Sequence, residues 1–471
     1  MRALPTLSLA VSCTALAAAA LVGCPTQEGE AEGEGEEGEG EGEAGPEMVL
    51  LETHLVDTDV DVSIPSGFAL AVRPDGRFAV AYGRASSSAP QVECEDSFGG
   101  APFVDAWDVL VVDEQADGTF RTRVVDSTAP LRSPFVDMVA DPTSGALIIG
   151  YTGGAVAVGA CEACDSRLAV ENGDTFTLST VATDGGSSPT PCRAIFQPVC
   201  GEGDCVGLNP GLAINASGQL AMTYVDQHFG FGETDIYKAD LEIGLGNSGG
   251  LTLESVATDS GSGYSNTVTM TDEGRAMTAY ATIGNARVVD PDDTSNDYII
   301  DEGIYASTQQ EDGSWSEVLI LEEGSSSGRI ATAYRAGSGF AIAWRDDGLE
   351  QLFLYTSVDN GASWTPVAIE QTSNTGKDPA IAFLSDGTLV AAYSHCKDRD
   401  DGSDFCSQAE DGVRIAMREQ GGPFVRKTFT FDDEDVDGKN VDMAIAADDT
   451  VVVMSFNASS ARIVVQRFRK Q

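Results

Sequence analysis

The sequence predicts an all-β protein, a seven-bladed β-propeller closed by pairing of its N- and C-terminal strands. Three features lead to this prediction: a repeated strand–turn–strand segment, a second hairpin after most of its copies, and a single strand left over at each end of the chain. Each copy reads as an apolar strand, a turn of Asp, Gly or Ser, and another apolar strand. The seven copies cover residues 68–83, 136–152, 211–225, 266–281, 329–345, 379–394 and 441–456.

The strands of these segments are apolar on both faces, which indicates that both faces are buried. In five copies a tyrosine follows the turn glycine by six residues, as Tyr82 follows Gly76. Trp344 and Phe456 hold nearly the same place in the other two copies. The second hairpins, such as residues 352–371, alternate between apolar and polar residues, as outer strands with one wet face do.

The two ends of the chain support a closed ring. After the seventh copy only one strand remains, at residues 461–468, so the last blade lacks its outermost strand. Residues 48–58 precede the first copy and have the character of an outermost strand. We expect the two to pair, because pairing would cover an otherwise bare sheet edge. Two smaller β domains are the alternative, and the single ring is favoured.

The N-terminus has the plan of a secretory signal. Arg2 is followed by a short apolar segment that ends in Leu-Val-Gly-Cys, with the cysteine at Cys24. This tetrapeptide resembles the lipobox of bacterial lipoproteins. The resemblance implies cleavage before Cys24, lipid on its sulfur, and a location at the bacterial outer membrane or cell surface. An ordinary signal peptide is the alternative. The predicted organisation is a signal peptide at 1–23, an acidic tether at 24–47 and the propeller at 48–471.

Charge excludes one class of partner. Residues 28–47 contain ten glutamates among Gly and Ala, so this tether cannot bury a core and should stay extended. The whole chain carries a formal net charge of -48. Such a protein is not expected to bind nucleic acid, which requires a basic surface.

Eight cysteines follow Cys24, and this even number in an exported protein favours disulfides. Cys396 and Cys406 lie in one predicted loop and are the pair we expect to be bonded. A zinc site that begins at Cys161 and Cys164 is the less favoured alternative, because the chain has only three histidines and none is near.

One outer hairpin carries a family resemblance. Its turn reads Ser-Val-Asp-Asn-Gly-Ala-Ser-Trp over residues 357–364. This resembles the Asp-box of sialidase-like BNR-repeat propellers, and looser versions lie at residues 171–176 and 312–315. The resemblance implies a propeller fold, with this turn on the face away from an active site. The early Phe-Arg-Ile-Pro motif of sialidases is absent. We therefore favour a binding or scaffold module for a glycan or an envelope protein. A sialidase-superfamily glycoside hydrolase stays open as the alternative, so enzymatic activity is undecided.

The loops opposite the short turns are long and irregular, so any ligand is expected on that rim. Polar residues just past the inner strands would form the floor of a ligand pocket. The candidates are Arg84, Asp226, His228, Arg345, Asp346 and His395.

Calcium is the cofactor that the sequence suggests. Asp433, Asp435 and Asp437 precede Gly438 in a pattern that begins like a Ca²⁺-binding loop. Ala444 stands where such a loop places its bidentate acid. Solvated acidic loops on an acidic protein are the alternative, and they are favoured.

Overall fold

The structure is a computed structural model, and it divides the chain into residues 1–44 and residues 45–471. All described residues belong to the second unit. They are residues 47–57, 67–85, 92–93, 103–104, 107–128, 135–153, 165–183, 205–228, 238–257, 262–282, 286–288, 298–300, 303–322, 329–346, 349–371, 375–396, 411–430, 439–457 and 460–471. No helix among them is long and apolar enough to span a bilayer.

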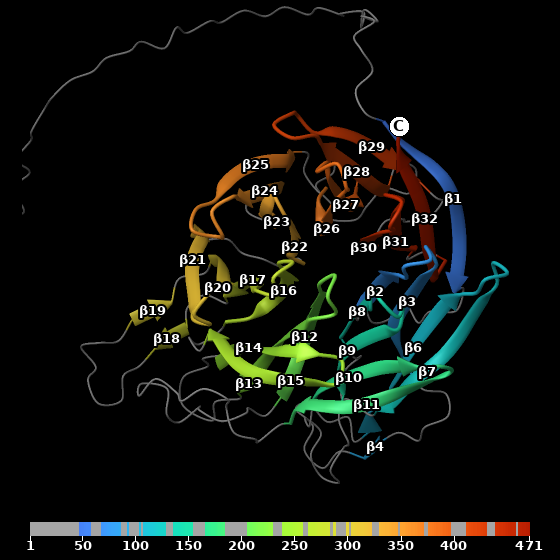
Figure 1. Cartoon of the computed structure of the whole chain (residues 1–471), viewed down its shortest axis with the longest axis horizontal. Helices are drawn as coiled ribbons and strands as arrows, with labels where there is room; N and C mark the ends of the chain where they lie inside the picture. The colour runs from blue at the N-terminus through green and yellow to red at the C-terminus, as the bar shows by residue number, and fades with distance from the viewer. Residues whose placement is uncertain are drawn as a thin grey trace, which may run out of the picture. The chain divides into compact units, whose positions relative to one another are not determined.

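These residues form seven four-stranded antiparallel sheets, the blades, arranged around a central channel (Figure 1). Named from the innermost strand outward, blade 1 contains β2 (Phe68–Val72), β3 (Phe78–Ala85), β6 (Trp107–Glu114) and β7 (Phe120–Thr128); blade 2 contains β8 (Val136–Ala140), β9 (Leu147–Gly153), β10 (Asp165–Asn172) and β11 (Thr175–Ala182); blade 3 contains β12 (Cys205–Ile214), β13 (Leu220–His228), β14 (Lys238–Asn247) and β15 (Gly250–Ala257). Blade 4 contains β16 (Tyr264–Met270), β17 (Ala276–Thr282), β20 (Gly303–Gln309) and β21 (Trp315–Glu322); blade 5 contains β22 (Ala331–Arg335), β23 (Gly339–Asp346), β24 (Gln351–Ser357) and β25 (Thr365–Glu370). Blade 6 contains β26 (Lys377–Phe383), β27 (Leu389–His395), β28 (Gly412–Arg418) and β29 (Val425–Phe429); blade 7 contains β30 (Lys439–Ile445), β31 (Val451–Asn457), β32 (Arg462–Lys470) and β1 (Met48–Asp57).

The last blade is shared by the two ends of the described chain. β1 pairs antiparallel with β32, from Met48 opposite Lys470 to Leu55 opposite Val464. The N-terminal strand is therefore the outermost strand of a blade whose other three strands are C-terminal (Figure 1). The predicted fold class, a seven-bladed propeller closed in this way, is confirmed.

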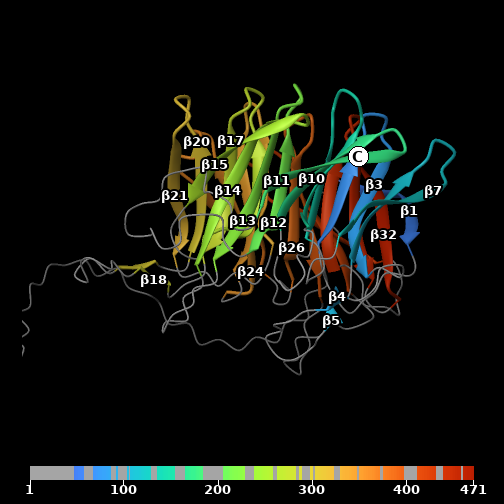
Figure 2. The same cartoon turned by 90° about the horizontal axis from the view of Figure 1, so that it is seen from below.

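The two rims of the ring differ. In blades 1 to 6 the first-to-second and third-to-fourth connections are short turns, as is the first-to-second connection of blade 7, and we call their side the tight-turn rim. The opposite side, the loop rim, carries the other connections. Two small sheets lie in second-to-third connections on the loop rim: β4 (Val92–Glu93) with β5 (Phe103–Val104), and β18 (Ala286–Val288) with β19 (Tyr298–Ile300). Figure 2 shows β4, β5 and β18 on the same side of the blades.

The repeated aromatic residue of each inner hairpin is a buried wedge in the second strand of its blade. The set consists of Tyr82, Tyr151, Tyr224, Tyr280, Trp344, Tyr393 and Phe456, and no member exposes more than 7% of its surface. In two of the blades the tyrosine hydroxyl reaches a carboxylate of the preceding blade. Tyr151 donates to Asp126 at 2.7 Å, and Tyr393 donates to Glu370 at 3.3 Å. These wedges join neighbouring blades by apolar contact and by hydrogen bonds.

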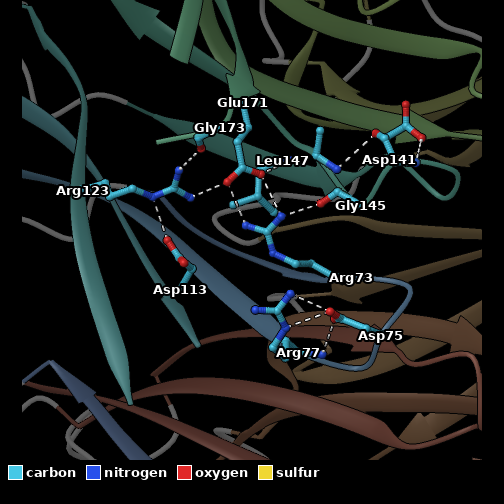
Figure 3. Close-up of polar contacts among 12 residues, drawn as sticks. Arg73, Asp75, Arg77, Asp113, Arg123, Asp141, Gly145, Leu147, Glu171 and Gly173 are labelled. Atoms are coloured by element: carbon cyan, nitrogen blue, oxygen red, sulfur yellow. Dashed lines mark hydrogen bonds and ion pairs between the residues drawn. The ribbon is translucent and has the colours of Figure 1, made fainter. Parts of the chain in front are cut away.

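Glu171 of β10 anchors a buried ion cluster between blades 1 and 2 on the tight-turn rim (Figure 3). Arg73 meets it with two nitrogens at 2.7 and 3.0 Å, and Arg123 donates to it at 2.7 Å. The backbone N–H of Leu147 donates at 2.9 Å, and Arg123 also pairs with Asp113 at 2.8 Å. Burial alone would raise the pKa of Glu171, but these hydrogen bonds lower it to about 2. The carboxylate is thus held charged in the fold.

Removing residues 48–56 tests the closure. The deletion should leave the edge of β32 bare, lower the melting temperature by at least about 5 °C and cause aggregation. Differential scanning fluorimetry and size-exclusion chromatography measure both effects. A truncated protein that melts like the parent and stays monomeric would show that the β1–β32 pairing is dispensable.

The substitution Glu171→Gln should lower the free energy of unfolding at pH 7 by roughly 2–4 kcal/mol, because it removes the counter-charge of the buried Arg73 and leaves Arg123 with that of Asp113 alone. The folded pKa of Glu171 lies below its ordinary 4.5, so its contribution is present above that pH and is lost as pH falls toward about 2. Urea unfolding should therefore depend less on pH in this acid range in the variant than in the parent. Asp174→Asn, at a carboxylate that is 86% exposed, is the matched control and should unfold like the parent. Equal acid sensitivity of parent and Glu171→Gln would contradict the assignment.

Candidate functional site

The innermost strands enclose a cavity of about 280 Å³ along the channel. All seven blades contribute to it, through β2, β8, β12, β16, β22, β26 and β30. Because these strands have no neighbour on the channel side, every second backbone N–H and C=O points into the cavity. A channel lined in this way is polar even where its side chains are apolar.

Two aspartates in identical Val-Asp-Met triplets tie the innermost strands together. Asp442 of β30 accepts from the backbone N–H of Leu70 at 2.8 Å and from that of Met443 at 3.0 Å. Asp137 of β8 accepts from Leu212 at 2.6 Å and from Met138 at 2.8 Å. Each aspartate therefore joins its blade to the next one around the ring. Sequence reasoning missed these residues, although the repeated triplet was a visible signal.

Arg329 precedes β22 in blade 5 and reaches across the channel mouth. Its Nη1 donates to the carbonyl of Val441 at 3.2 Å and lies 3.5 Å from Asp442 Oδ1. The pKa of Arg329 is raised, first by the charge of Asp442 and also by those of Asp137 and Asp378. The side chain nevertheless keeps 36% of its surface exposed and lines the cavity.

The pKa of Asp137 departs from its ordinary value. Burial, with repulsion from Asp442, raises the pKa of Asp137 to about 6, even though Arg329 and the backbone N–H of Leu212 oppose the rise. Asp137 therefore gains a proton in mildly acidic water. Asp137 and Asp442 offer hydrogen-bond acceptors on blades 2 and 7, near the cation of Arg329.

The loop-rim mouth is built by a repeated irregularity of the innermost strands. Asn209, Ser265, Asp378 and Asn440 have left-handed backbones with φ of 47–50°. Each lies beside a register shift in the pairing of its strand with the second strand. Asp378 accepts from the N–H of Asn440 at 3.1 Å, which links blades 6 and 7 at the mouth. This irregularity places the short polar side chains of these four residues at the loop-rim end of the channel.

Two of the predicted ligand residues, Arg345 and His395, meet at Thr375 between blades 5 and 6, and Asp346 follows Arg345 in the chain. Arg345 and Asp346 end β23, and His395 ends β27; each is at most 9% exposed. Arg345 Nε donates to the carbonyl of Thr375 at 3.1 Å, and burial lowers the pKa of Arg345. Asp346 accepts from the N–H of Leu349 at 2.9 Å.

His395 is held from both ring nitrogens. Its Nε2 lies 2.9 Å from Arg414 Nη2, and its Nδ1 lies 3.0 Å from the hydroxyl of Thr375. A guanidinium can only donate, so Nε2 accepts and the proton is on Nδ1. Arg414 also pairs with Glu370 at 2.7 Å. Arg345, Asp346 and His395 are thus hydrogen-bonded within the protein. Their role in ligand binding stays a prediction.

The other three predicted residues lie in blades 1 and 3. Arg84 is near the end of β3 and is partly buried, whereas Asp226 of β13 is 2% exposed and lies opposite Asp240 in β14. The backbone of His228 ends β13 opposite Lys238, and its side chain lies outside the described residues. All six predicted positions are thus at the loop-rim ends of second strands, but they are spread over four blades.

Several predicted residues are not described. Cys24, Cys406, Asp433, Asp435 and Asp437 lie outside the described residues. Cys396 is 4% exposed, and its pairing with Cys406 stays a prediction. Within the described ranges, no group of three or more His, Cys, Asp or Glu side chains is placed to hold a metal ion.

Asp359 stabilises the turn between β24 and β25. Its two carboxylate oxygens accept from the hydroxyl of Ser357 at 2.8 Å, the N–H of Ser363 at 2.9 Å and the hydroxyl of Ser363 at 2.6 Å. These bonds, that from the Ser363 hydroxyl first, lower the pKa of Asp359 to about 2. Trp364 closes the turn by donating to the carbonyl of Gly361 at 3.0 Å. Asp359 therefore stabilises the fold on the tight-turn rim.

No protein-family model and no curated protein sequence matches this chain. Solved structures share its propeller fold at low identity. Trypanosoma rangeli sialidase is 12% identical, with a TM-score of 0.42 over 75% of this chain and 56% of its own. A Hadza microbial sialidase is 12% identical, with a TM-score of 0.45 over 77% of this chain and 73% of its own. Penicillium chrysogenum α-L-arabinanase is 12% identical, with a TM-score of 0.42 over 89% and 98%. The chain thus spans little more than half of the trypanosomal sialidase, and these likenesses concern the fold alone.

Proposed function

We propose that this chain is a lipid-anchored propeller of the bacterial cell envelope that binds a glycan, free or carried by an envelope protein, at the loop-rim mouth of its channel. The observation that carries the proposal is the division of the cavity wall into hydrogen-bond donors and acceptors. Sugar hydroxyls both donate and accept, so a wall with both kinds of partner suits them.

The donor side of the cavity lies on blades 4 to 6. The inward N–H groups of Val268, Thr332 and Ile381 occupy the places that Leu70 and Leu212 hold in blades 1 and 3. In the described part of the chain, no side chain accepts a hydrogen bond from these three N–H groups. The preceding blades have Gly211, Thr267 and Ala331 at the positions where blades 2 and 7 have Asp137 and Asp442. Arg329, which precedes β22 of blade 5, reaches across the mouth and adds guanidinium donors beside Asp442 of blade 7.

The acceptor side consists of Asp137 and Asp442, on blades 2 and 7. Each aspartate already accepts two backbone N–H groups, but a carboxylate offers about four acceptor sites. A hydroxylated ligand between the two sides would donate to these oxygens and accept from Arg329. The volume of about 280 Å³ admits a ligand of the size of one sugar unit.

The anchoring part of the proposal rests on Cys24 and on the path of the chain. β1 begins at the tight-turn rim, where Met48 lies opposite Lys470 at the end of β32. A chain held from that rim leaves the loop rim available to a ligand. We also propose kinship with the Asp-box propellers, which the contacts of Asp359 support.

Arg329→Met should weaken binding at least about tenfold, because it removes the charge-assisted donors from the mouth of the cavity. The purified chain and the variant are compared on a glycan array, with Kd of the strongest glycans then measured by calorimetry. Arg275→Met, at a turn of the tight-turn rim, is the matched control and should bind like the parent. Unchanged binding by Arg329→Met would remove the channel mouth from consideration.

A glycoside hydrolase is the second candidate, and one observation favours it. Such enzymes use a carboxyl group whose raised pKa lets it donate a proton, together with a second carboxylate, and burial raises the pKa of Asp137 to about 6. Release of fluorophore from aryl glycosides by the parent, abolished in Asp137→Asn with binding retained, would favour catalysis. Binding without turnover would favour the first proposal.

Cys24→Ser tests the anchor. The variant should lose incorporation of an alkynyl fatty acid in growing cells, because the thioether sulfur is gone, and its signal peptide should remain uncleaved. Gel fluorescence after click labelling measures the first effect and mass spectrometry the second. Cys13→Ser, in the same predicted signal segment, is the matched control. Equal labelling of Cys24→Ser and parent would end the lipoprotein proposal.

A further inference from the structure

The charged side chains that line the channel cavity do not balance. Among the described residues of its wall they are two carboxylates, Asp137 and Asp442, and one guanidinium, Arg329. Asp378 lies close enough to raise the pKa of Arg329 by its charge, and it adds a further carboxylate at the mouth. When both lining aspartates are ionised, the wall of the cavity is therefore net negative.

Arg329, the cation of this wall, is paired with Asp442 and not with Asp137. Its Nη1 lies 3.5 Å from Asp442 Oδ1. In the described part of the chain no basic side chain forms an ion pair with Asp137. Its Oδ1 accepts from the N–H of Met138 at 2.8 Å and its Oδ2 accepts from the N–H of Leu212 at 2.6 Å. Both donors are neutral amides, so the charge of Asp137 has no direct counter-charge there.

Asp137 is nevertheless within reach of a ligand, because it lines the cavity and keeps part of its surface exposed. Burial in the channel raises the pKa of Asp137 to about 6, and Arg329 opposes this rise without cancelling it. Each carboxylate oxygen accepts one backbone N–H, so about two of its four acceptor sites are open. A ligand that brings positive charge to these sites would supply the missing counter-charge.

An ammonium group suits this position better than a metal ion does. Within the described ranges, no three His, Cys, Asp or Glu side chains are grouped to hold a metal. An ammonium group needs only the one carboxylate, to which it donates a charge-assisted hydrogen bond. The rest of the ligand has to accept, because the N–H groups of Val268, Thr332 and Ile381 point into the cavity from blades 4 to 6. Hydroxyl oxygens are such acceptors, whereas a linear polyamine has none.

We propose that the ligand of the channel mouth is an amino sugar with a free amine, whose ammonium group pairs with Asp137 while its hydroxyl oxygens accept from the N–H groups of blades 4 to 6. The inference rests on the proposed glycan site and names the class of sugar that this site prefers. Neutral sugars enter the same place more weakly, because they leave the charge of Asp137 unbalanced. Acidic sugars are the least favoured, because the carboxylates of the wall repel them.

This pairing makes the affinity depend on pH. The ammonium group is attracted to the ionised form of Asp137, on which the charges of Arg329 and Asp442 also act. Since the pKa of Asp137 is about 6 in the free protein, affinity for an amino sugar is fully present above that pH and is lost as pH falls below it. The ionised fraction falls roughly tenfold from about pH 7 to about pH 5, and Kd should rise by that factor. Below the pKa, binding also releases a proton, because the bound ammonium group drives Asp137 to its ionised form.

Isothermal titration calorimetry of the purified chain tests the inference, with glucosamine and galactosamine compared with glucose, galactose and glucuronic acid. At about pH 7 at least one amino sugar should bind roughly tenfold or more tightly than its neutral counterpart, and glucuronic acid should bind least. At about pH 5.5, titrations in two buffers of different ionisation enthalpy should show proton release with the amino sugar and little with the neutral one. This second measurement uses the parent chain, so it does not depend on whether a variant folds.

Asp137→Asn, checked for folding by circular dichroism, should lower the affinity for the amino sugar to that of its neutral counterpart and remove the proton release. Asp174→Asn removes the same charge at a carboxylate that is 86% exposed on the tight-turn rim, and it should bind like the parent.

Neutral sugars that bind as tightly as the amino sugars, or amino-sugar binding without proton release, would overturn this inference. The proposed glycan site would survive that result if Arg329→Met still weakened binding. Spermidine that binds as tightly as the amino sugars would indicate a general cation site and would also overturn the inference. Failure of every sugar in the panel to bind would contradict both proposals.

Discussion

The pairing of β1 with β32 is the constraint on which the rest of the structure depends. It completes blade 7 as a four-stranded sheet with a strand from the other end of the described chain, and it fixes blade 7 against blade 1. Contacts across that seam then become possible. Asp442 accepts from Leu70 at 2.8 Å, and Arg467 of β32 pairs with Glu114 at 2.5 Å. Without the closed ring the innermost strands would not surround a channel, and Arg329 would have no Asp442 to face.

Much of this fold could be predicted because its signals are local. Apolar strands separated by Asp/Gly turns define each inner hairpin, and the tyrosine at a constant distance from the turn marks the second strand. Tyr151 and Tyr393 show why that position recurs: a buried ring fills the space between blades while its hydroxyl finds a carboxylate of the preceding blade. The surplus strands at the two ends required only the rule that sheet edges are covered.

The channel site could not be predicted in the same way, because its contacts join blades that are distant in sequence. Arg329, Asp137 and Asp442 come from blades 5, 2 and 7, and their proximity follows from closure. The predicted polar residues all lie at the loop rim, but they are at the ends of second strands in four different blades. Arg345 and His395 meet because blades 5 and 6 are neighbours, and Thr375 contacts both. Arg84 and Asp226 lie in other blades.

We propose above all that a ligand binds at the loop-rim mouth of the channel. Crystals of the protein soaked in a mixture of neutral monosaccharides would test it most directly. We expect sugar density in contact with the guanidinium of Arg329 and a carboxylate oxygen of Asp442 or Asp137. Density that appears only against the tight-turn rim or the outer strands, with the channel holding water alone, would contradict it.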